Sequence, residues 1–271
     1  MSYKLIVTDM DGTLLGSNHQ VTDENKLALK KALEKGINVA VATGRMFDSA
    51  KSHTSFLGNK MPIISCNGAL IQEAETGEVI YSNKMDSNVC LDIINILEKH
   101  NVFYQCCTSD TLMCKYNKEY LEKYKDIHDS MAKEINIVIK DDFTKDVLEN
   151  DILKLIVSEE NNSELLEKLK KDISKIADLE ITSSWFNNIE IMNKDVNKGN
   201  AVSHIAKYLG IDKKDIIAFG DNYNDVSMLE YVGMGVAMGN ADDFIKEKAN
   251  YVTSINDESG VAKALYNLAG I

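Results

Sequence analysis

The chain has 271 residues, of which 44% are hydrophobic and 27% are charged. It is long enough to bury a full core and has the composition of an ordinary soluble globular protein. Its net charge of −12 argues against a surface that binds a nucleic-acid backbone, since no excess of Lys and Arg exists to neutralise phosphates, and its apolar runs are too short to span a membrane.

The first third of the chain alternates between apolar strand-like runs and helical patterns. Residues 4–9 form an apolar run that ends in a tight turn, and a helical pattern follows over residues 22–36. Residues 37–42 and 62–66 are two further apolar runs with a helical stretch between them. Strands and helices that alternate at this spacing predict a parallel, doubly wound sheet with right-handed crossovers.

From about residue 84 the pattern changes to short strand-like runs, some close enough to pair as hairpins. The runs are residues 102–107 with 111–116, residues 135–139, residues 152–157, and residues 179–184 with 188–192. Helical segments lie between them. Because hairpins imply an antiparallel sheet, this middle part is predicted to be a separate α+β domain.

The last part of the chain returns to the first pattern. A helical stretch over residues 200–209 ends at Gly210, and apolar strands follow at 216–219 and 234–238, each with helices after it. The predicted fold class is therefore α/β. A doubly wound parallel-sheet core would be built from residues 1–83 and 194–271, with an α+β domain, residues 84–193, inserted between them.

The five cysteines are an odd number, without CxxC spacing or clustered histidines. They are better explained as reduced, buried thiols than as disulfides or zinc ligands. Residues Met1–Lys4 run straight into the first strand with no long apolar segment typical of a secretion signal. We therefore expect a cytoplasmic protein.

Polar residues gather where the predicted parallel strands end, and such ends meet at one edge of a sheet. Asp9 directly follows the first strand, Asp11 lies two residues later, and Asp221 follows the strand at 216–219. An Asp-rich run with Gly12 can be an ordinary turn, and Asp221 can be the N-cap of the next helix. However, adjacent carboxylates at the end of a buried strand need a cation, and a hard Mg²⁺ ion suits oxygen ligands.

Other residues at this edge could bind an anion. Thr43 and Gly44 offer a hydroxyl and a backbone N–H at an expected helix start, which is either an anion site or a plain N-cap. Lys198 supplies a local cation, although a lysine before a glycine is usually exposed to solvent. Asn224 and Asp225, taken alone, are ordinary helix-start residues.

Together these segments resemble the four motifs of the haloacid dehalogenase-like (HAD) hydrolases, in order and spacing. The segments are DMDGT at 9–13, ATGR at 42–45, NKG at 197–199 and GDNYND at 220–225. The insertion between the second and third motifs, with Cys66-Asn67-Gly68-Ala69, resembles the Cof-type subfamily with a type IIB cap domain.

The resemblance implies a role for each matching residue. Asp9 would be the nucleophile and Asp11 the general acid and base. Mg²⁺ would be held by the Asp9 and Asp221 carboxylates and the Asp11 backbone carbonyl. The phosphate would be bound by Met10, Thr43, Gly44, Lys198 and Asn224, with Asp225, Arg45 and Asn67 in supporting roles. In the cap, Tyr116, Trp185, Asn187 and Asn188 are candidate substrate contacts, although a core or surface role is the stronger expectation for each.

The function expected is that of a Mg²⁺-dependent phosphatase for small phosphorylated metabolites, sugar phosphates above all, acting through an aspartyl-phosphate. Two alternatives remain open. A phosphomutase would return the phosphoryl group to a sugar phosphate, and a non-catalytic regulator would only bind one. The expected partner is a small phosphorylated substrate, with no nucleic acid and no membrane, and the chain is expected to be a monomer or weak homo-oligomer.

Overall fold

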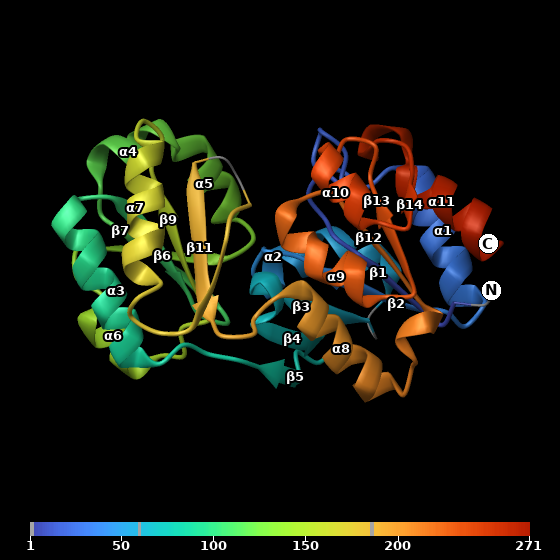
Figure 1. Ribbon diagram of the computed structural model, residues 1–271, viewed down its shortest axis with the longest axis horizontal. Coiled ribbons are helices and arrows are strands. Elements are labelled where there is room, and N and C mark those ends of the chain that lie inside the picture. The colour runs from blue at the N-terminus through green and yellow to red at the C-terminus, as the bar shows by residue number, and fades with distance from the viewer. Residues whose placement is uncertain (1–2, 59–60, 185–186) are drawn as a thin grey trace. The chain divides into compact units, whose positions relative to one another are not determined.

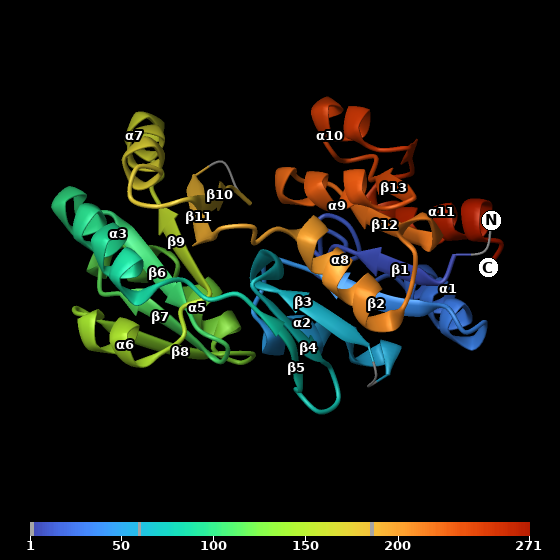
Figure 2. The ribbon, with the colours of Figure 1, turned by 60° about the horizontal axis from the view of Figure 1, so that its bottom comes forward.

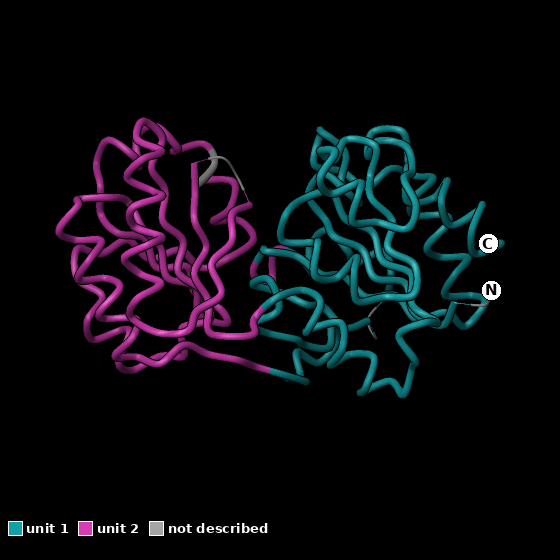
Figure 3. Tube along the Cα trace, viewed as in Figure 1, with its two compact units in different colours: residues 1–45, 50–81, 197–271 teal, residues 46–49, 82–196 magenta. Residues whose placement is uncertain are grey.

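The structure is a computed structural model that describes residues 3–58, 61–184 and 187–271. Its backbone divides into two compact units (Figure 3). Unit 1 comprises Met1–Arg45, Ala50–Tyr81 and Asn197–Ile271, and unit 2 comprises Met46–Ser49 and Ser82–Val196. The independent domains expected at 1–83 with 194–271, and at 84–193, stay a prediction.

Unit 1 contains a sheet of eight strands in the order β14-β13-β12-β1-β2-β3-β4-β5 (Figure 1). The strands from β14 to β3 are parallel, as predicted, and β4 turns back antiparallel to β3. The strands are β1 (Leu5–Thr8), β2 (Asn38–Ala42), β3 (Pro62–Ser65), β4 (Leu70–Glu73), β5 (Val79–Ser82), β12 (Ile216–Gly220), β13 (Met234–Ala237) and β14 (Tyr251–Val252).

Helices cover this sheet, as expected of a doubly wound fold. Apolar residues of α8 and α9 pack with those of β1 and β2 in one buried cluster. On α1, the buried Asn25 donates to the Leu14 carbonyl and accepts from the Ala262 N–H, which ties α1 to α11. The helices of this part are α1 (Asp23–Glu34), α2 (Phe47–Thr54), α8 (Lys198–Leu209), α9 (Val226–Tyr231), α10 (Asp243–Lys248) and α11 (Gly260–Ala269).

The register of the three central strands brings three loops to one sheet edge. In β1, Thr8 lies opposite Val41 of β2 and Phe219 of β12. The residues that follow these three strands therefore leave the sheet side by side at its carboxyl edge. This edge carries Asp9, Thr43 and Asp221.

Unit 2 contains a six-stranded sheet in the order β10-β11-β9-β6-β7-β8 (Figure 2). Apolar residues of α3, α6 and α7 pack on one face of it. The strands are β6 (Phe103–Cys107), β7 (Thr111–Lys115), β8 (Asn136–Lys140), β9 (Lys154–Ser158), β10 (Leu179–Thr182) and β11 (Asn188–Asn193). The helices are α3 (Ser87–His100), α4 (Lys118–Lys123), α5 (Lys125–Met131), α6 (Thr144–Glu149) and α7 (Ser163–Ile173).

Both predicted hairpins are confirmed, because β6–β7 and β10–β11 pair antiparallel. The expectation of an antiparallel sheet is wrong for β8, which pairs parallel with β7. The reason is the long connection between them, which contains α4 and α5 and so acts as a crossover instead of a tight turn. All five cysteines are free and buried, as predicted. Among the described residues, every helix is too short or too polar to cross a membrane.

Candidate active site

Lys198 is the first residue of α8, and its side chain is completely buried. Its Nζ atom lies 2.6 Å from Asp9 Oδ1 and 2.6 Å from Asp225 Oδ1. Burial alone would lower the pKa of Lys198, but the two carboxylates outweigh burial and raise the pKa above its ordinary value. Lys198 is therefore a buried ammonium ion held between two carboxylates, so the alternative that it is an ordinary solvent-exposed lysine does not hold.

Asp9 follows β1 directly and is buried with this lysine. Among the protein's own groups, burial raises its pKa most, and the Asp225 carboxylate adds to the rise. The Lys198 ammonium opposes both effects but does not cancel them. A second positive charge beside Asp9 would therefore stabilise its ionised form.

Asp225 is fully buried, and the protein uses both of its oxygens. While Oδ1 accepts from Lys198, Oδ2 accepts from the N–H groups of Asp221 and Asn222, each at 3.0 Å. Asn222 and Asp225 form a capping box around the short helical turn Tyr223–Asp225. The N-cap at this point is therefore Asn222, not Asp221 as the alternative interpretation proposed.

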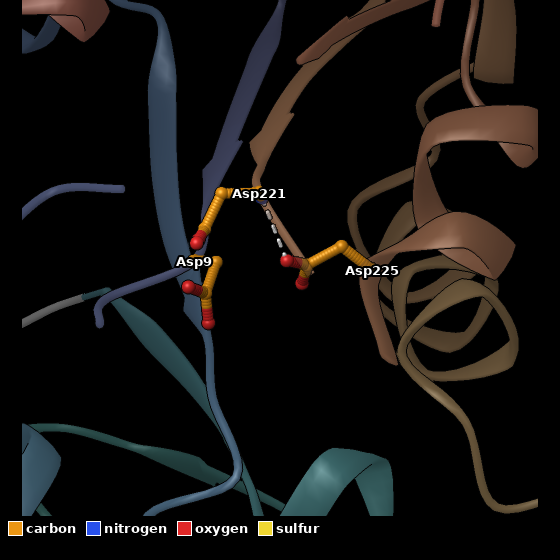
Figure 4. A group of neighbouring side chains, drawn as sticks. All are labelled: Asp9, Asp221 and Asp225. Carbon is orange, nitrogen blue, oxygen red and sulfur yellow. Dashed lines mark hydrogen bonds between the residues drawn. The ribbon is translucent and has the colours of Figure 1, made fainter. Parts of the chain in front are cut away.

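Asp221 instead turns toward the loop after β1. It accepts a 2.7 Å hydrogen bond from the Thr13 hydroxyl. Burial, and then the Asp225 carboxylate, raise the pKa of Asp221 to about 7. Carboxylate oxygens of Asp9, Asp221 and Asp225 all lie within 4.8 Å of one another (Figure 4), which is a group that could hold a metal ion.

Gly12 fits between this cluster and its surroundings only because it has no side chain. Its φ is +76°, and a Cβ atom there would lie 2.3 Å from Asp221 Oδ2. Its carbonyl accepts a 2.8 Å hydrogen bond from Asn240, whose amide also lies 3.5 Å from Asp221 Oδ2. Asn240 was not predicted to be a site residue, although it is a polar residue just beyond the apolar strand β13, at the same sheet edge.

Asp11 is oriented by Arg45 through two hydrogen bonds. Nε donates to Oδ2 at 2.8 Å and a terminal nitrogen donates to Oδ1 at 2.7 Å. Burial would raise the pKa of Asp11, but this bidentate guanidinium outweighs it and lowers the pKa below its ordinary range. The Asp11 side chain is 51% exposed, unlike that of Asp9.

Thr43 and Gly44 do not start a helix, because α2 begins only at Phe47. The buried Thr43 hydroxyl instead accepts from the Arg45 N–H at 3.1 Å in a local turn. The N-cap interpretation of Thr43 is therefore wrong, and so is the expected helix-start position of the anion site. A polar, tightly folded loop remains at the carboxyl end of β2.

Asn67 connects two of the predicted loops. Its backbone is left-handed, with φ +56°, and its N–H donates to the Thr43 carbonyl at 3.0 Å. Its side-chain oxygen accepts from the Asn224 amide at 3.1 Å, and a Cβ on Gly44 would lie only 3.0 Å from the same oxygen. Met10, by contrast, has a fully buried side chain, and its carbonyl accepts from Thr13 and Leu15.

The formal charges of this edge do not balance. Four carboxylates, on Asp9, Asp11, Asp221 and Asp225, face two cations, on Lys198 and Arg45. The excess of two negative charges, the oxygen donors and the raised pKa of Asp221 all fit a hard divalent cation. Because both Asp225 oxygens are already used, Asp9 and Asp221 are the better side-chain ligands.

Comparisons with known proteins point to one family. A family described as haloacid dehalogenase-like hydrolase matches residues 6–265. The chain is 36% identical to the phosphatase YwpJ of Bacillus subtilis (strain 168), over 98% of this chain and 99% of that protein. It is 33% identical to the 5-amino-6-(5-phospho-D-ribitylamino)uracil phosphatase YcsE of the same organism, over 97% and 94%.

A solved structure extends the likeness to the fold of the whole chain. It is described as a sugar phosphatase of HAD subclass IIB, with a TM-score of 0.83 and 25% sequence identity. The alignment covers 99% of this chain and all of that one. The predicted parallel-sheet core with an inserted cap domain of this subclass is thereby confirmed.

Proposed function

The chain belongs to the haloacid dehalogenase-like hydrolases and is a phosphatase, and we propose that it uses Mg²⁺ and an aspartyl-phosphate on Asp9 to hydrolyse small phosphorylated metabolites. The observation that carries this proposal is the buried Lys198 ammonium, held 2.6 Å from both Asp9 and Asp225. This fixed cation beside a carboxylate at the edge of the sheet supports the proposal that a phosphate dianion is bound there next to its nucleophile.

Asp9 and Asp221, with the backbone carbonyl of Asp11, are proposed to hold Mg²⁺. When bound, the ion would neutralise the excess carboxylate charge and the charge on the phosphoryl oxygens. Thr13 and Asn240 support this role from the protein side. Thr13 orients Asp221, and Asn240 fixes the Gly12 carbonyl beside it.

In the first half-reaction, Asp9 attacks phosphorus and the ester P–O bond breaks. The bond that forms is an acyl phosphate on Asp9, and the leaving alkoxide takes a proton from Asp11. Lys198 holds Asp9 Oδ1 in one position, so the carboxylate does not have to reorient before attack. Asp225 in turn accepts a hydrogen bond from Lys198 and is proposed to act by fixing that ammonium.

In the second half-reaction, water attacks phosphorus and Asp11 takes its proton. The paired, ionised Asp11 of this structure has the protonation state that this step needs. The first half-reaction needs a protonated Asp11, so Arg45 has to release the carboxylate first. An incoming phosphate offers Arg45 another anion with the same fork-like geometry.

The phosphate oxygens are proposed to be bound by Lys198, Thr43, Asn224 and the N–H groups of Met10 and Gly44. Asn67 supports the set, because it accepts from Asn224 and lies against Gly44. In related sites, one such donor is worth about 3 kcal/mol of transition-state stabilisation.

Sugar phosphates, the substrates expected first from the sequence, are one candidate class, supported by the subclass IIB sugar phosphatase. A relative named for a ribitylaminouracil phosphate indicates that the organic part of the substrate varies between similar proteins. Of the cap candidates, Tyr116 is 51% exposed, Asn187 is half-buried, Asn188 donates to Ser184, and Trp185 lies outside the described residues. A cytoplasmic location and a monomer or weak homo-oligomer also stay predictions.

The test is a screen of phosphorylated metabolites for release of inorganic phosphate, with Mg²⁺ and with EDTA. The proposal predicts phosphate release that needs Mg²⁺. Sugar phosphates that are isomerised without loss of organic phosphate would instead identify a phosphomutase. Tight binding with no change in any ester would identify a regulator.

A further inference from the structure

Two exposed aromatic side chains stack on each other in unit 1. The ring centroids of Tyr223 and Phe244 lie 5.7 Å apart, with an angle of 18° between the ring planes. Tyr223 is 55% exposed and Phe244 is 47% exposed. A contiguous, half-exposed aromatic pair is more informative than a single exposed apolar residue, because such pairs are typical of binding surfaces.

The pair lies at the same sheet edge as the carboxylate cluster. Tyr223 stands in the helical turn between Asp221 and Asp225, two residues from each. The Cα atom of Tyr223 is therefore within about 7 Å of the Cα atoms of Asp221 and Asp225. The helix α10 follows β13 (Figure 1). Phe244 is in the first turn of α10, and the loop before this helix contains Asn240, which donates to the Gly12 carbonyl.

Polar contacts hold both rings in place. The Tyr223 hydroxyl donates to the Asp242 carboxylate, which is itself fixed as the N-cap of α10 by the Ile245 N–H. The Lys248 ammonium lies 5.7 Å from the centre of the Phe244 ring and also contacts Glu230 at 2.9 Å. The rings are thus ordered without being buried, which is the condition for a preorganised docking surface.

We propose that Tyr223 and Phe244 form a docking surface for the leaving group of the substrate, and that this group carries a planar aromatic ring. The inference rests on the proposed phosphatase function and specifies its substrate class. Tyr223 is only two residues along the chain from Asp221 and from Asp225, so the proposal places the ring of a leaving group held near this cluster against the aromatic pair. Flat rings stack on such a surface better than saturated rings of equal size.

The experiment compares benzyl phosphate with cyclohexylmethyl phosphate. Both esters release a primary alcohol of similar size. Any difference in their intrinsic reactivity is the same for every variant, so a change in the preference between variants reports on contact with the ring. kcat and KM are measured for the wild type, Phe244→Leu, Phe244→Ala and Tyr223→Ala. Tyr208→Ala is the control, because Tyr208 is 64% exposed but lies at the far end of α8, about 15 Å from Lys198.

The wild type is expected to prefer benzyl phosphate in kcat/KM. Each change at Phe244 or Tyr223 should reduce that preference by about 2- to 10-fold, mostly through KM, as expected for a lost stacking contact. Phe244→Leu keeps an apolar side chain and so tests the aromatic character even if Phe244→Ala does not fold.

An unchanged preference in the Phe244 and Tyr223 variants, or an equal change in Tyr208→Ala, would overturn the docking surface. In that case phosphate release from either ester still leaves the phosphatase assignment standing. If the wild type releases phosphate from neither ester nor from any metabolite in the screen, the proposed function itself fails.

Discussion

Lys198 Nζ lies 2.6 Å from Asp9 Oδ1, although the two residues are 189 positions apart in the chain. The same nitrogen contacts Asp225, so one buried ammonium joins the loops after β1 and β12 to the start of α8. Two carboxylates packed this closely would repel each other without it. The contact is therefore a structural requirement of the site as well as a means of orienting Asp9.

Replacing Lys198 by Met should remove activity and also destabilise the protein. Loss of one partner from a buried ion pair leaves uncompensated charge and typically costs about 3–5 kcal/mol. We expect kcat/KM to fall at least about 100-fold and the urea midpoint to decrease. Lys207→Met is the control, because Lys207 is exposed on the same helix. Near-normal activity in a folded Lys198→Met variant would rule out this role.

The pKa of Asp221, raised to about 7, predicts a pH-dependent effect of Mg²⁺ on stability. An acid whose pKa is raised on folding lowers stability progressively between its unfolded value, about 3.9, and its folded value. Without Mg²⁺ this contribution is therefore most unfavourable above pH 7. Mg²⁺ relieves it, so the rise in Tm on adding Mg²⁺ should be larger at pH 8 than at pH 5.

Asp221→Asn provides the check on that prediction. It keeps the shape of the side chain but removes the charge, so at pH 8 without Mg²⁺ it should be more stable than the wild type. It should also lose the stabilisation by Mg²⁺, which amounts to about 2.7 kcal/mol at a concentration 100-fold above Kd. An equal Mg²⁺ effect at both pH values in the wild type would contradict the assignment of Asp221 as a ligand.

Gly12 and Gly36 form a matched pair for testing the carboxylate cluster. Both have a positive φ, +76° and +77°, but a Cβ on Gly12 would collide with Asp221 whereas a Cβ on Gly36 meets open space. Each change to Ala should cost about 1–2 kcal/mol in backbone strain. Only Gly12→Ala should also displace Asp221 and lower kcat/KM at least tenfold. Equal activity of the two variants would show that the space beside Asp221 is unimportant.

Arg45 should set the acidic limb of the pH–rate profile. When paired with Asp11 it lowers the pKa of that carboxyl, so once Arg45 has returned to Asp11 after the first half-reaction, Asp11 remains ionised to low pH as the base of the second. In Arg45→Met the pKa of Asp11 rises, and the acidic limb of kcat should move to higher pH. Arg45→Lys keeps the charge but not the bidentate contact, so its limb should lie between the two. An unmoved limb in Arg45→Met would refute this dependence.

The sequence predicted five of the parallel strands, β1, β2, β3, β12 and β13, because each is a continuous apolar run, as strands buried on both faces have to be. The parallel strand β14 was missed, because it has only two residues and neither is fully buried. Strands β4 and β5 were missed, since LIQE and VIYS are short and only half-buried, and so they resemble loop residues. The parallel pairing of β8 with β7 could not be predicted from the sequence either. It depends on where the chain returns after α4 and α5, which no local pattern encodes.

The carboxylate cluster was predictable for a simple reason. Parallel strands end at one edge, and Asp9 and Asp221 each directly follow such a strand. The burial of Lys198 was not predictable from its neighbours, because it depends on partners 27 and 189 residues away. The Arg45–Asp11 contact and the hydrogen bond from the Asn240 amide could not be predicted for the same reason. Each joins loops whose proximity follows only from the finished sheet.

The most direct test of the account is to trap the phosphorylated enzyme. Wild-type protein is mixed with a turned-over substrate and Mg²⁺, quenched in acid, reduced with borohydride and analysed as peptides by mass spectrometry. Borohydride converts an aspartyl-phosphate to homoserine, and the account predicts homoserine at position 9, only in samples that received substrate. Sustained turnover with Asp9 unmodified, or homoserine at any other aspartate, would contradict it.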